Sequence, residues 1–398
     1  MKRLAVVFNQ HTPYVRARLR ATGALLPLTA FTLRDDDEIW EEARTAKDPY
    51  TLRALLQEGE SPTPGRIIRA VHQALDQEGP EVVVVDGWTR RSSLAALAWC
   101  GRQRVPAVLM LDFQSAGRPG GDIGDAVRLR LLRGCSAVLT GGKTHADILV
   151  RLGVPREQIR VGYDVVDNAY FTESAAEARR IASSYHKRLD LPRNYLICVG
   201  RLEREKNLPR LLDAYAAYRR ELGKKAWKLV IAGDGTQYPD LSLRIHQMEL
   251  RDQVILAGTF NYRVMPAVYG LAQAFVLAST REPWGLAVNE AMASGLPVFV
   301  SDRVSCGPEL VRNGENGYIF DAQKPGDLTS HLLKATRGEY NLSVMGCASL
   351  GLISEWTLER FARRLVEAAE IAQANPATPS RWDRSLTSIL ARRPGAPN

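Results

Sequence analysis

The sequence predicts an α/β protein made of two doubly wound domains, each built around a parallel sheet. Three observations lead to this prediction. The chain has 398 residues, enough for two domains of ordinary size. Short apolar and β-branched runs alternate with stretches of helical periodicity along its whole length, the pattern of parallel strands joined by crossover helices. Residues 82–85 are all valine, as in a strand that is buried on both faces.

The expected strands form two sets, which we assign to two domains. The first set comprises residues 4–8, 28–33, 82–85, 107–111, 137–140 and 159–162. The second set comprises residues 195–200, 228–232, 254–257, 275–278, 298–300 and 318–320. A polar helical stretch, residues 173–187, separates the two sets, so we place the domain boundary near residue 175.

The end of the chain is predicted to hold a helix and a tail. Apolar residues at three- and four-residue spacing indicate an amphipathic helix that ends near residue 374. Residues 375–398 are rich in Pro, Ser and Arg, which favours a flexible basic tail. We therefore divide the chain into a first domain (1–175), a second domain (176–355), a final helix (356–374) and this tail.

Charge and cysteine usage exclude several classes of protein. The net charge of +9 is spread over both domains, so no domain resembles a nucleic-acid clamp. The five cysteines form no C-x-x-C pair, and no apolar run is long enough to cross a bilayer, which together indicate a cytoplasmic protein. Residues 14–26 carry Arg16, Arg18 and Arg20 beside leucines, as in a solvated helix or one that rests on an anionic membrane. Peripheral contact with the inner face of the membrane therefore stays open.

The strongest motif follows the expected strand at 275–278. Glu282 lies in the loop after this strand, Gly285 allows close backbone approach, and a helix is expected from residue 286. The free amides and the positive dipole end of such a helix favour an anion. Glu290 lies about one turn inside the helix, so the two acids suit hydroxyl recognition beside a bound phosphate. The alternative is that these acids only complement the helix dipole.

A second motif follows the first strand of the second domain. Arg201 and Lys206 are five residues apart across a strand-to-helix turn, a spacing that lets both converge on one anion. Glu203 and Glu205 lie between them, and the alternative is that these acids pair with the two cations. A Gly233-Asp234-Gly235 turn follows the next strand.

Together these motifs resemble those of the retaining glycosyltransferases of family 4. The resemblance rests on the Glu282-x7-Glu290 spacing, the G-R-x4-K loop and the G-x-G turn, and it weakens before residue 82. It implies the GT-B fold, in which two Rossmann-like domains face a central cleft. It also implies that the last helix crosses back to the first domain.

The resemblance further implies roles for the charged residues of the second domain. Arg201 and Lys206 match the pair that neutralises the diphosphate of the donor. Glu290 matches the acid that holds the hydroxyls of the nucleotide ribose, and Glu282 matches the residue that contacts the transferred sugar. Similar enzymes need no metal ion, so we expect no cofactor besides the nucleotide diphosphate-sugar co-substrate, with UDP as the default carrier.

Further donor contacts are expected from backbone groups and from one aromatic ring. Trp284, Gly285 and Leu286 match the segment whose amides approach the distal phosphate. Gly233 belongs to the matching G-x-G turn. The base of the donor is expected near residues 258–262, where Phe260 and Tyr262 are candidate stacking partners. The alternative for either ring is ordinary packing.

The first domain departs from the family pattern. The loop after its first strand lacks the usual glycine pair and contains His11, with Tyr14 close behind. The stretch that usually ends in a histidine offers Asp112 instead. We expect Asp112 to act as a polar contact or base, and we take His11 and Tyr14 as candidates on the acceptor side. An exposed loop carboxylate is the alternative for Asp112.

These observations lead to one function and two alternatives. We expect a metal-independent, retaining transfer of a sugar from a nucleotide diphosphate donor to a hydroxyl of a glycan, a lipid-linked acceptor or a small molecule. The alternatives are a nucleotide-sugar 2-epimerase with the same fold and a non-catalytic nucleotide-sugar-binding subunit. The donor sugar, the acceptor and the oligomeric state stay open.

Overall fold

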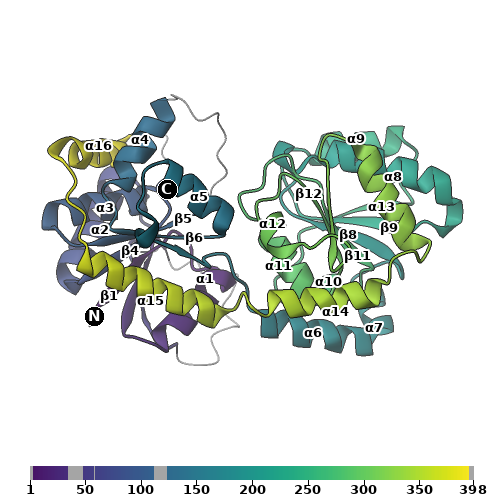
Figure 1. Cartoon of the computed structure of the whole chain (residues 1–398), viewed down its shortest axis with the longest axis horizontal. Coiled ribbons are helices and arrows are strands. Elements are labelled where there is room, and N and C mark those ends of the chain that lie inside the picture. Colours follow the sequence, from purple (N-terminus) through teal and green to yellow (C-terminus); the bar gives the residue numbers. More distant parts are fainter. Residues whose placement is uncertain (1–2, 35–47, 58, 112–122, 394–398) are drawn as a thin grey trace. The chain divides into compact units, whose positions relative to one another are not determined.

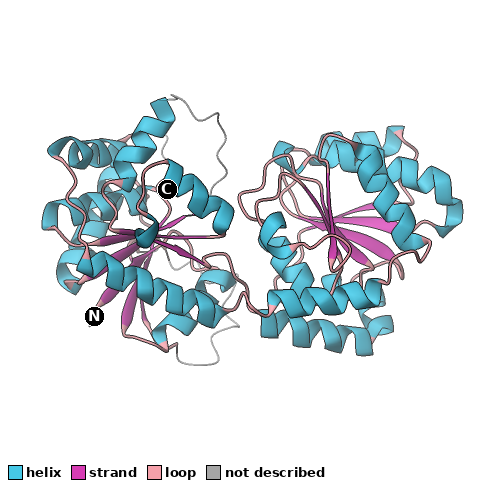
Figure 2. Ribbon diagram, in the orientation of Figure 1, coloured by secondary structure: helices cyan, strands magenta, loops and turns pink. Residues whose placement is uncertain are grey.

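The computed structural model describes residues 3–34, 48–57, 59–111 and 123–393. It divides into two compact units, one formed by Met1–Val165 with Leu358–Asn398 and the other by Val166–Thr357. In each unit helices flank a sheet whose strands all run parallel (Figure 2). The predicted α/β class with two doubly wound domains is therefore confirmed.

The sheet of the first unit has seven strands in the order β3-β2-β1-β4-β5-β6-β7 (Figure 1). The strands are β1 Leu4–Val7, β2 Leu28–Thr32, β3 Thr51–Ala54, β4 Val82–Asp86, β5 Ala107–Leu111, β6 Ala137–Thr140 and β7 Ile159–Val161. All six predicted strands are present. Strand β3 was not predicted, because this edge strand is largely exposed and has only one large apolar side chain.

Seven helices surround this sheet in the described part of the first unit. They are α1 Pro13–Gly23, α2 Pro64–Glu78, α3 Arg91–Gln103, α4 Ile123–Leu132, α5 Lys143–Arg151, α15 Leu358–Ala374 and α16 Arg381–Arg392. A short 3₁₀ turn, Arg156–Gln158, precedes β7. Helix α1 begins at a proline, with the Thr12 hydroxyl accepting from the amide of Val15. Helix α15 lies against α1, with Phe361 and Leu365 buried (Figure 1).

The sheet of the second unit has six strands in the order β10-β9-β8-β11-β12-β13. They are β8 Tyr195–Val199, β9 Lys228–Ala232, β10 Val254–Gly258, β11 Ala274–Leu277, β12 Val298–Ser301 and β13 Gly317–Phe320. The helices are α6 Asn168–Arg180, α7 Ala182–Arg188, α8 Leu208–Leu222, α9 Tyr238–Gln247, α10 Met265–Gly270, α11 Leu286–Ala293, α12 Gly307–Leu310, α13 Pro325–Thr336 and α14 Leu342–Ile353. Each predicted strand of the second set is confirmed.

Helix α6 lies where the sequence analysis placed the domain boundary. The predicted boundary at residue 175 falls inside this helix, whereas the second unit begins at Val166. Helix α6 packs against α10 and α11, and the Thr172 hydroxyl donates to the carbonyl of Ala293 at 2.7 Å. These contacts make the whole helix part of the second unit.

The prediction of a flexible tail is wrong over Arg381–Arg392, which form α16. A capping box starts this helix: Ser380 accepts from the amide of Asp383, and the Asp383 carboxylate accepts from the amide of Ser380. The helix then buries Thr387 and Ala391 against the first unit. The Pro- and Arg-rich composition concealed both the cap and the apolar face.

Two of the three arginines of α1 are buried, so for Arg16 and Arg18 neither a solvated helix face nor a membrane contact applies. The Arg16 guanidinium is buried and bonds Asp48 through two nitrogens, at 3.0 and 3.4 Å. The Arg18 guanidinium is buried and donates twice to the carbonyl of Val165. Only Arg20 is exposed, and it also reaches Asp48 at 3.4 Å. Within the described ranges no helix has the length and apolarity that crossing a bilayer requires.

Candidate functional site

The carboxyl edge of the second sheet brings the two sequence motifs together. Strands β9, β8 and β11 are neighbours, so the loops that follow them emerge side by side. These loops carry Arg201 and Lys206 after β8, Gly233 after β9, and Glu282 after β11. The amide of Thr280 donates to the carbonyl of Glu205 at 2.7 Å and so links the first loop to the third.

Gly233 holds the loops after β8 and β9 close together. A Cβ atom at this position would lie 2.0 Å from the carbonyl oxygen of Gly200, and the φ of Gly233 is 143°. Only glycine fits such a position. The amide of Leu202 donates to the carbonyl of Asp234 at 2.9 Å across the same contact. Gly233 thus shapes this loop contact through its backbone, and its predicted contact with the donor stays a prediction.

Lys206 and Glu282 form a largely buried ion pair at this edge. Lys206 Nζ lies 2.5 Å from Glu282 Oε2, and the side chains are 15% and 10% exposed. The Ser279 hydroxyl donates to the same oxygen at 3.0 Å. The ion pair and the Ser279 bond hold the Lys206 ammonium in one position at this edge, which is the preorganisation that stabilising a developing negative charge requires. Ser279 was not predicted as a site residue, although it directly follows the expected strand at 275–278.

Arg201 has a different partner from Lys206. Its side chain is 78% exposed, and a guanidinium nitrogen lies 3.7 Å from Glu205. This is the pairing that the sequence analysis kept as an alternative. Glu203 instead accepts from the Thr236 hydroxyl at 2.7 Å, and its bonds with Thr236 lower the pKa of Glu203. Because exposed ion pairs are weak, little free energy opposes rotation of Arg201 toward an anion.

Helix α11 begins at Leu286, and Gly285 caps its N-terminus beside Glu282. The φ of Gly285 is 106°, a left-handed conformation that favours glycine. The Trp284 ring is buried and donates to Asn289 at 2.9 Å, with its centroid 5.1 Å from that of Trp356. The Trp284 side chain therefore anchors the loop. Gly285 and Leu286 supply amides at the helix N-terminus, where the dipole favours an anion.

Glu290 lies one turn deeper in α11 and is buried. The Tyr269 hydroxyl on α10 donates to Glu290 Oε2 at 2.6 Å. Burial and the nearby charge of Glu290 also raise the pKa of Tyr262. Tyr269 was missed by the sequence analysis, because nothing in the spacing of residues 265–270 connects this helix to Glu290.

The two candidate stacking residues differ in their surroundings. The ring of Tyr262 stacks on Tyr170 of α6, with centroids 5.2 Å apart and an interplanar angle of 6°. It also meets Phe171 edge-on at 5.7 Å. Phe260 is half-buried and lies in the loop after β10. Tyr262 thus has a packing role within the unit, while Phe260 stays the predicted base contact.

The acceptor-side candidates are only partly covered by the structure. Asp112 lies outside the described residues. His11 follows β1, and its Nε2 lies 2.7 Å from the Tyr50 hydroxyl. Tyr14 is half-buried in the first turn of α1. His11 and Tyr14 thus lie near the carboxyl end of β1, and their predicted roles stay predictions.

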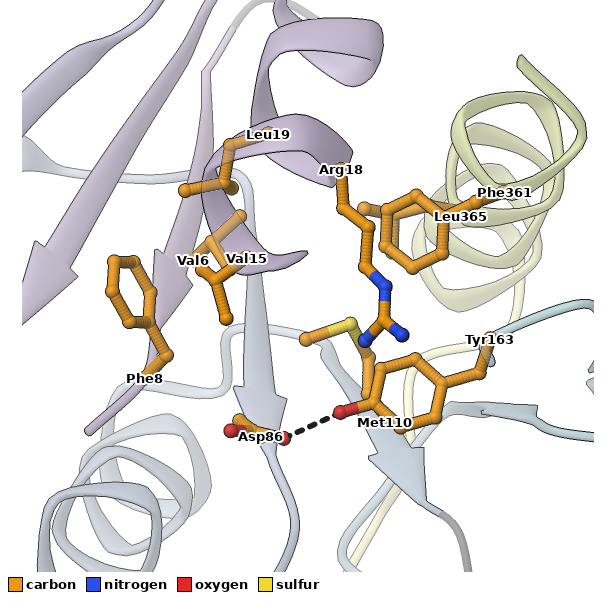
Figure 3. Close-up of a pocket in the computed structure, with 10 residues that line it drawn as sticks. All are labelled: Val6, Phe8, Val15, Arg18, Leu19, Asp86, Met110, Tyr163, Phe361 and Leu365. Carbon is orange, nitrogen blue, oxygen red and sulfur yellow. Dashed lines mark hydrogen bonds between the residues drawn. The ribbon is translucent and has the colours of Figure 1, made fainter. Parts of the chain in front are cut away.

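The first unit has a small cavity beside these residues (Figure 3). The Tyr163 hydroxyl donates to Asp86 at 2.8 Å, and the Arg18 guanidinium lies 4.8 Å from the centroid of the Tyr163 ring. Phe361 of α15 covers Arg18 from another side, as Figure 3 shows. The volume of about 20 Å³ suits a water molecule rather than a substrate. Asp86 could have been suspected from the sequence, because it directly follows the valine strand.

No site for a metal ion is recognisable in the described ranges. Histidine, cysteine, aspartate and glutamate side chains form no group of three or more there that could hold one. Four of the five cysteines are buried, Cys347 is exposed, and all five are free thiols. Metal-independent chemistry stays a prediction.

Two family models match the chain. The model described as glycosyl transferase 4-like domain matches residues 9–163, and the model described as glycosyl transferases group 1 matches residues 183–346. The two matches correspond to the two structural units.

The chain is also similar to curated proteins and to a solved structure. Mannosylfructose-phosphate synthase of Agrobacterium fabrum is 26% identical over 242 residues, which are 58% of this chain and 52% of that protein. The α-D-kanosaminyltransferase of Streptomyces kanamyceticus is 27% identical over 212 residues, 52% of this chain and 53% of that protein. The chain thus spans about half the length of the curated relatives it matches. Anabaena HepE, solved with UDP and glucose, has a TM-score of 0.72 at 15% identity, covering 92% of this chain and 99% of that one, which shows the shared fold.

Proposed function

Because the chain belongs to the group 1 glycosyltransferases, of the family 4 type with the GT-B fold, we propose that it transfers a sugar with retention from a nucleotide diphosphate donor to a hydroxyl group. The observation that carries this proposal is the buried Lys206–Glu282 pair beside the N-terminus of α11. It combines a cation for a phosphate, amides for the same phosphate and a carboxylate for a sugar hydroxyl.

The donor is proposed to bind along this edge of the second unit. Lys206 and Arg201 neutralise the diphosphate, and the amides of Gly285 and Leu286 bind its distal phosphate. Glu290, oriented by Tyr269, accepts from the ribose hydroxyls. Phe260 stacks on the base. UDP is the proposed carrier, and the UDP complex of Anabaena HepE supports this choice.

The proposed chemistry depends on the negative charge that develops on the leaving nucleoside diphosphate. The bond between the anomeric carbon and the phosphate oxygen breaks, and its electron pair goes to the nucleoside diphosphate. Lys206 and the helix amides stabilise this charge, and a preorganised donor of this kind contributes about 3 kcal/mol to the transition state. The acceptor oxygen bonds to the anomeric carbon on the face that the phosphate leaves, and its proton goes to a phosphate oxygen. Glu282 positions the sugar, and no step requires a metal ion.

The acceptor is proposed to be bound by the first unit. His11, Tyr14 and Asp112 are the candidates for contact with its hydroxyl. The acceptor is a glycan, a lipid-linked sugar or a small molecule. Five free cysteines suit the reducing cytoplasm, where we propose that the protein works.

Two measurements test this proposal. Thermal shifts with UDP, GDP, ADP and TDP identify the carrier, because a ligand at 100 times its dissociation constant adds about 2.7 kcal/mol to stability. The matching donor is then incubated with acceptor mixtures, and NMR reads the anomeric configuration of the product. A product with inverted configuration would overturn retention. Conversion of the donor to its epimer without acceptor would support the epimerase instead.

Glu282→Gln tests the role of the carboxylate. The amide keeps the shape but weakens the interaction with sugar hydroxyls, so we expect turnover to fall at least tenfold while UDP binding is retained. Near-normal turnover would remove Glu282 from the sugar site. Arg201→Ala should weaken both donor affinity and rate.

A further inference from the structure

Helix α16 is fixed firmly on the first unit. Beside its capping box, Asp383 bonds the guanidinium of Arg130 on α4 at 3.1 Å. Arg91 of α3 is buried and donates to the carbonyl of Ala391 at 2.7 Å. Leu94 of α3 and Ala391 belong to one buried apolar cluster. These contacts determine which face of α16 points outward.

The outward face carries two large exposed apolar side chains. Trp382 is 79% exposed and Ile389 is 64% exposed, the two highest values among the large apolar side chains of the described residues. They are seven residues apart, which places them on one face of the helix, about 10 Å apart along its axis. Figure 1 shows α16 outermost on the unit, beside α3 and α4. The face is thus turned away from the core of its own unit.

Arginines surround this face. Arg381, Arg392 and Arg393 are exposed, whereas Arg384 is half-buried and donates to the carbonyl of Gly101 on α3 at 3.5 Å. The single acid of α16, Asp383, is buried and already bonded to Arg130. Arg102 of α3 and Arg133, which directly follows α4, are also exposed. The exposed charged side chains of α16 itself are therefore all arginines, and its one acid is already neutralised.

This combination fits a lipid surface better than a protein partner. A stable protein–protein interface buries about 1,200–2,000 Å² of accessible surface. Two apolar side chains on one face of a single helix supply far less. Tryptophan favours the water–lipid boundary, and arginines beside an amphipathic helix attract anionic lipids. We propose that the outward face of α16 docks the protein on an anionic membrane, with Trp382 and Ile389 inserted among the lipids. The docking does not rest on the proposed function, because it is measurable without donor or acceptor.

Vesicle sedimentation tests the docking surface with the full chain. We expect binding to vesicles containing phosphatidylglycerol, little binding to pure phosphatidylcholine, and release at high salt. The double variant Trp382→Ser/Ile389→Ser should lower partitioning at least about tenfold, because it removes the inserted side chains. Arg381→Gln/Arg393→Gln should lower it about 25-fold, since each arginine near such a surface contributes roughly a factor of five.

Matched variants in the second unit serve as controls. Leu243→Ser removes a side chain that is 56% exposed, and Arg220→Gln/Arg251→Gln removes two exposed charges. These variants should bind as the unchanged protein does, and all variants should keep its melting temperature. The proposal is overturned if the unchanged protein ignores anionic vesicles, or if the control variants lose binding equally. It is also overturned if the protein is a dimer in solution and Trp382→Ser converts it to a monomer without changing vesicle binding.

Discussion

The carboxyl edges of the two sheets have the same topology but different chemistry. In each sheet the first strand, β1 or β8, stands third in the order, with the next strand of its unit on one side and a later strand on the other. In the second unit the loops at this edge carry a buried Lys206–Glu282 pair and a glycine contact. In the first unit the bonded pairs hold no lysine or glutamate: His11 lies 2.7 Å from the Tyr50 hydroxyl, and the Tyr163 hydroxyl donates to Asp86.

A shared sheet topology supplies only part of a binding site. It brings loops to one edge, but the side chains decide whether that edge binds a ligand or stabilises the fold. Arg18 and Lys206 show this best. Both are largely buried cations, yet Arg18 donates to the carbonyl of Val165 beneath an aromatic ring, whereas Lys206 faces a carboxylate at a helix mouth.

The largest expected effect comes from Lys206→Ala. Loss of the ammonium removes a preorganised charge from the leaving diphosphate, so kcat/KM should fall 10²–10³-fold, by about 3–4 kcal/mol. The control is Lys143→Ala, because Lys143 follows β6 of the first sheet, is 73% exposed and pairs with Asp147. Its kcat/KM should stay within twofold. If kcat/KM fell equally in the two variants, the second edge would not be the one that binds the diphosphate.

Arg18→Ala should act on stability rather than on the donor. The variant removes two hydrogen bonds to the carbonyl of Val165, so we expect the free energy of unfolding to fall by about 2–3 kcal/mol. Urea denaturation measures this loss. The dissociation constant of the nucleotide, from calorimetry, should not change. If the variant bound the nucleotide more weakly while its free energy of unfolding was unchanged, a structural role for Arg18 would be contradicted.

The sequence predicted the second edge much better than the first. Glycines and charged residues at fixed spacing after β8, β9 and β11 can be recognised in the sequence. These three strands are neighbours in the sheet, so the loops that carry those residues lie side by side. Tyr269 and Ser279 were missed, because their bonds to the two glutamates depend on how α10 and the loop after β11 pack. In the first unit, Arg16 and Arg18 resembled surface charges, since their partners lie 32 and 147 residues away in the sequence.

Gly233→Ala tests whether backbone contact sets the geometry of the second edge. Its Cβ would meet the carbonyl oxygen of Gly200 at 2.0 Å, so the loops must separate, and we expect a loss of about 2 kcal/mol in stability with weaker donor binding. Gly326→Ala is the control, because a Cβ there meets no atom within 4 Å. Gly326→Ala should change neither stability nor donor binding. If Gly233→Ala were as stable as Gly326→Ala, the backbone contact between Gly233 and Gly200 would be dispensable.

The smallest effects compare one tyrosine from each unit. Tyr269 donates to Glu290 at 2.6 Å and Tyr163 donates to Asp86 at 2.8 Å, so replacement by phenylalanine removes the same kind of bond from each. Each loss should amount to about 1.5 kcal/mol, but it should appear in different measurements. Tyr269→Phe should raise KM for the donor about tenfold with little change in kcat, because Glu290 loses its orientation. Tyr163→Phe should lower the melting temperature and leave KM for the donor unchanged, because Asp86 belongs to the packing of the first unit. If both variants raised KM for the donor equally, Asp86 would belong to the donor site as well, and the contrast between an edge that binds the donor and one that does not would fail.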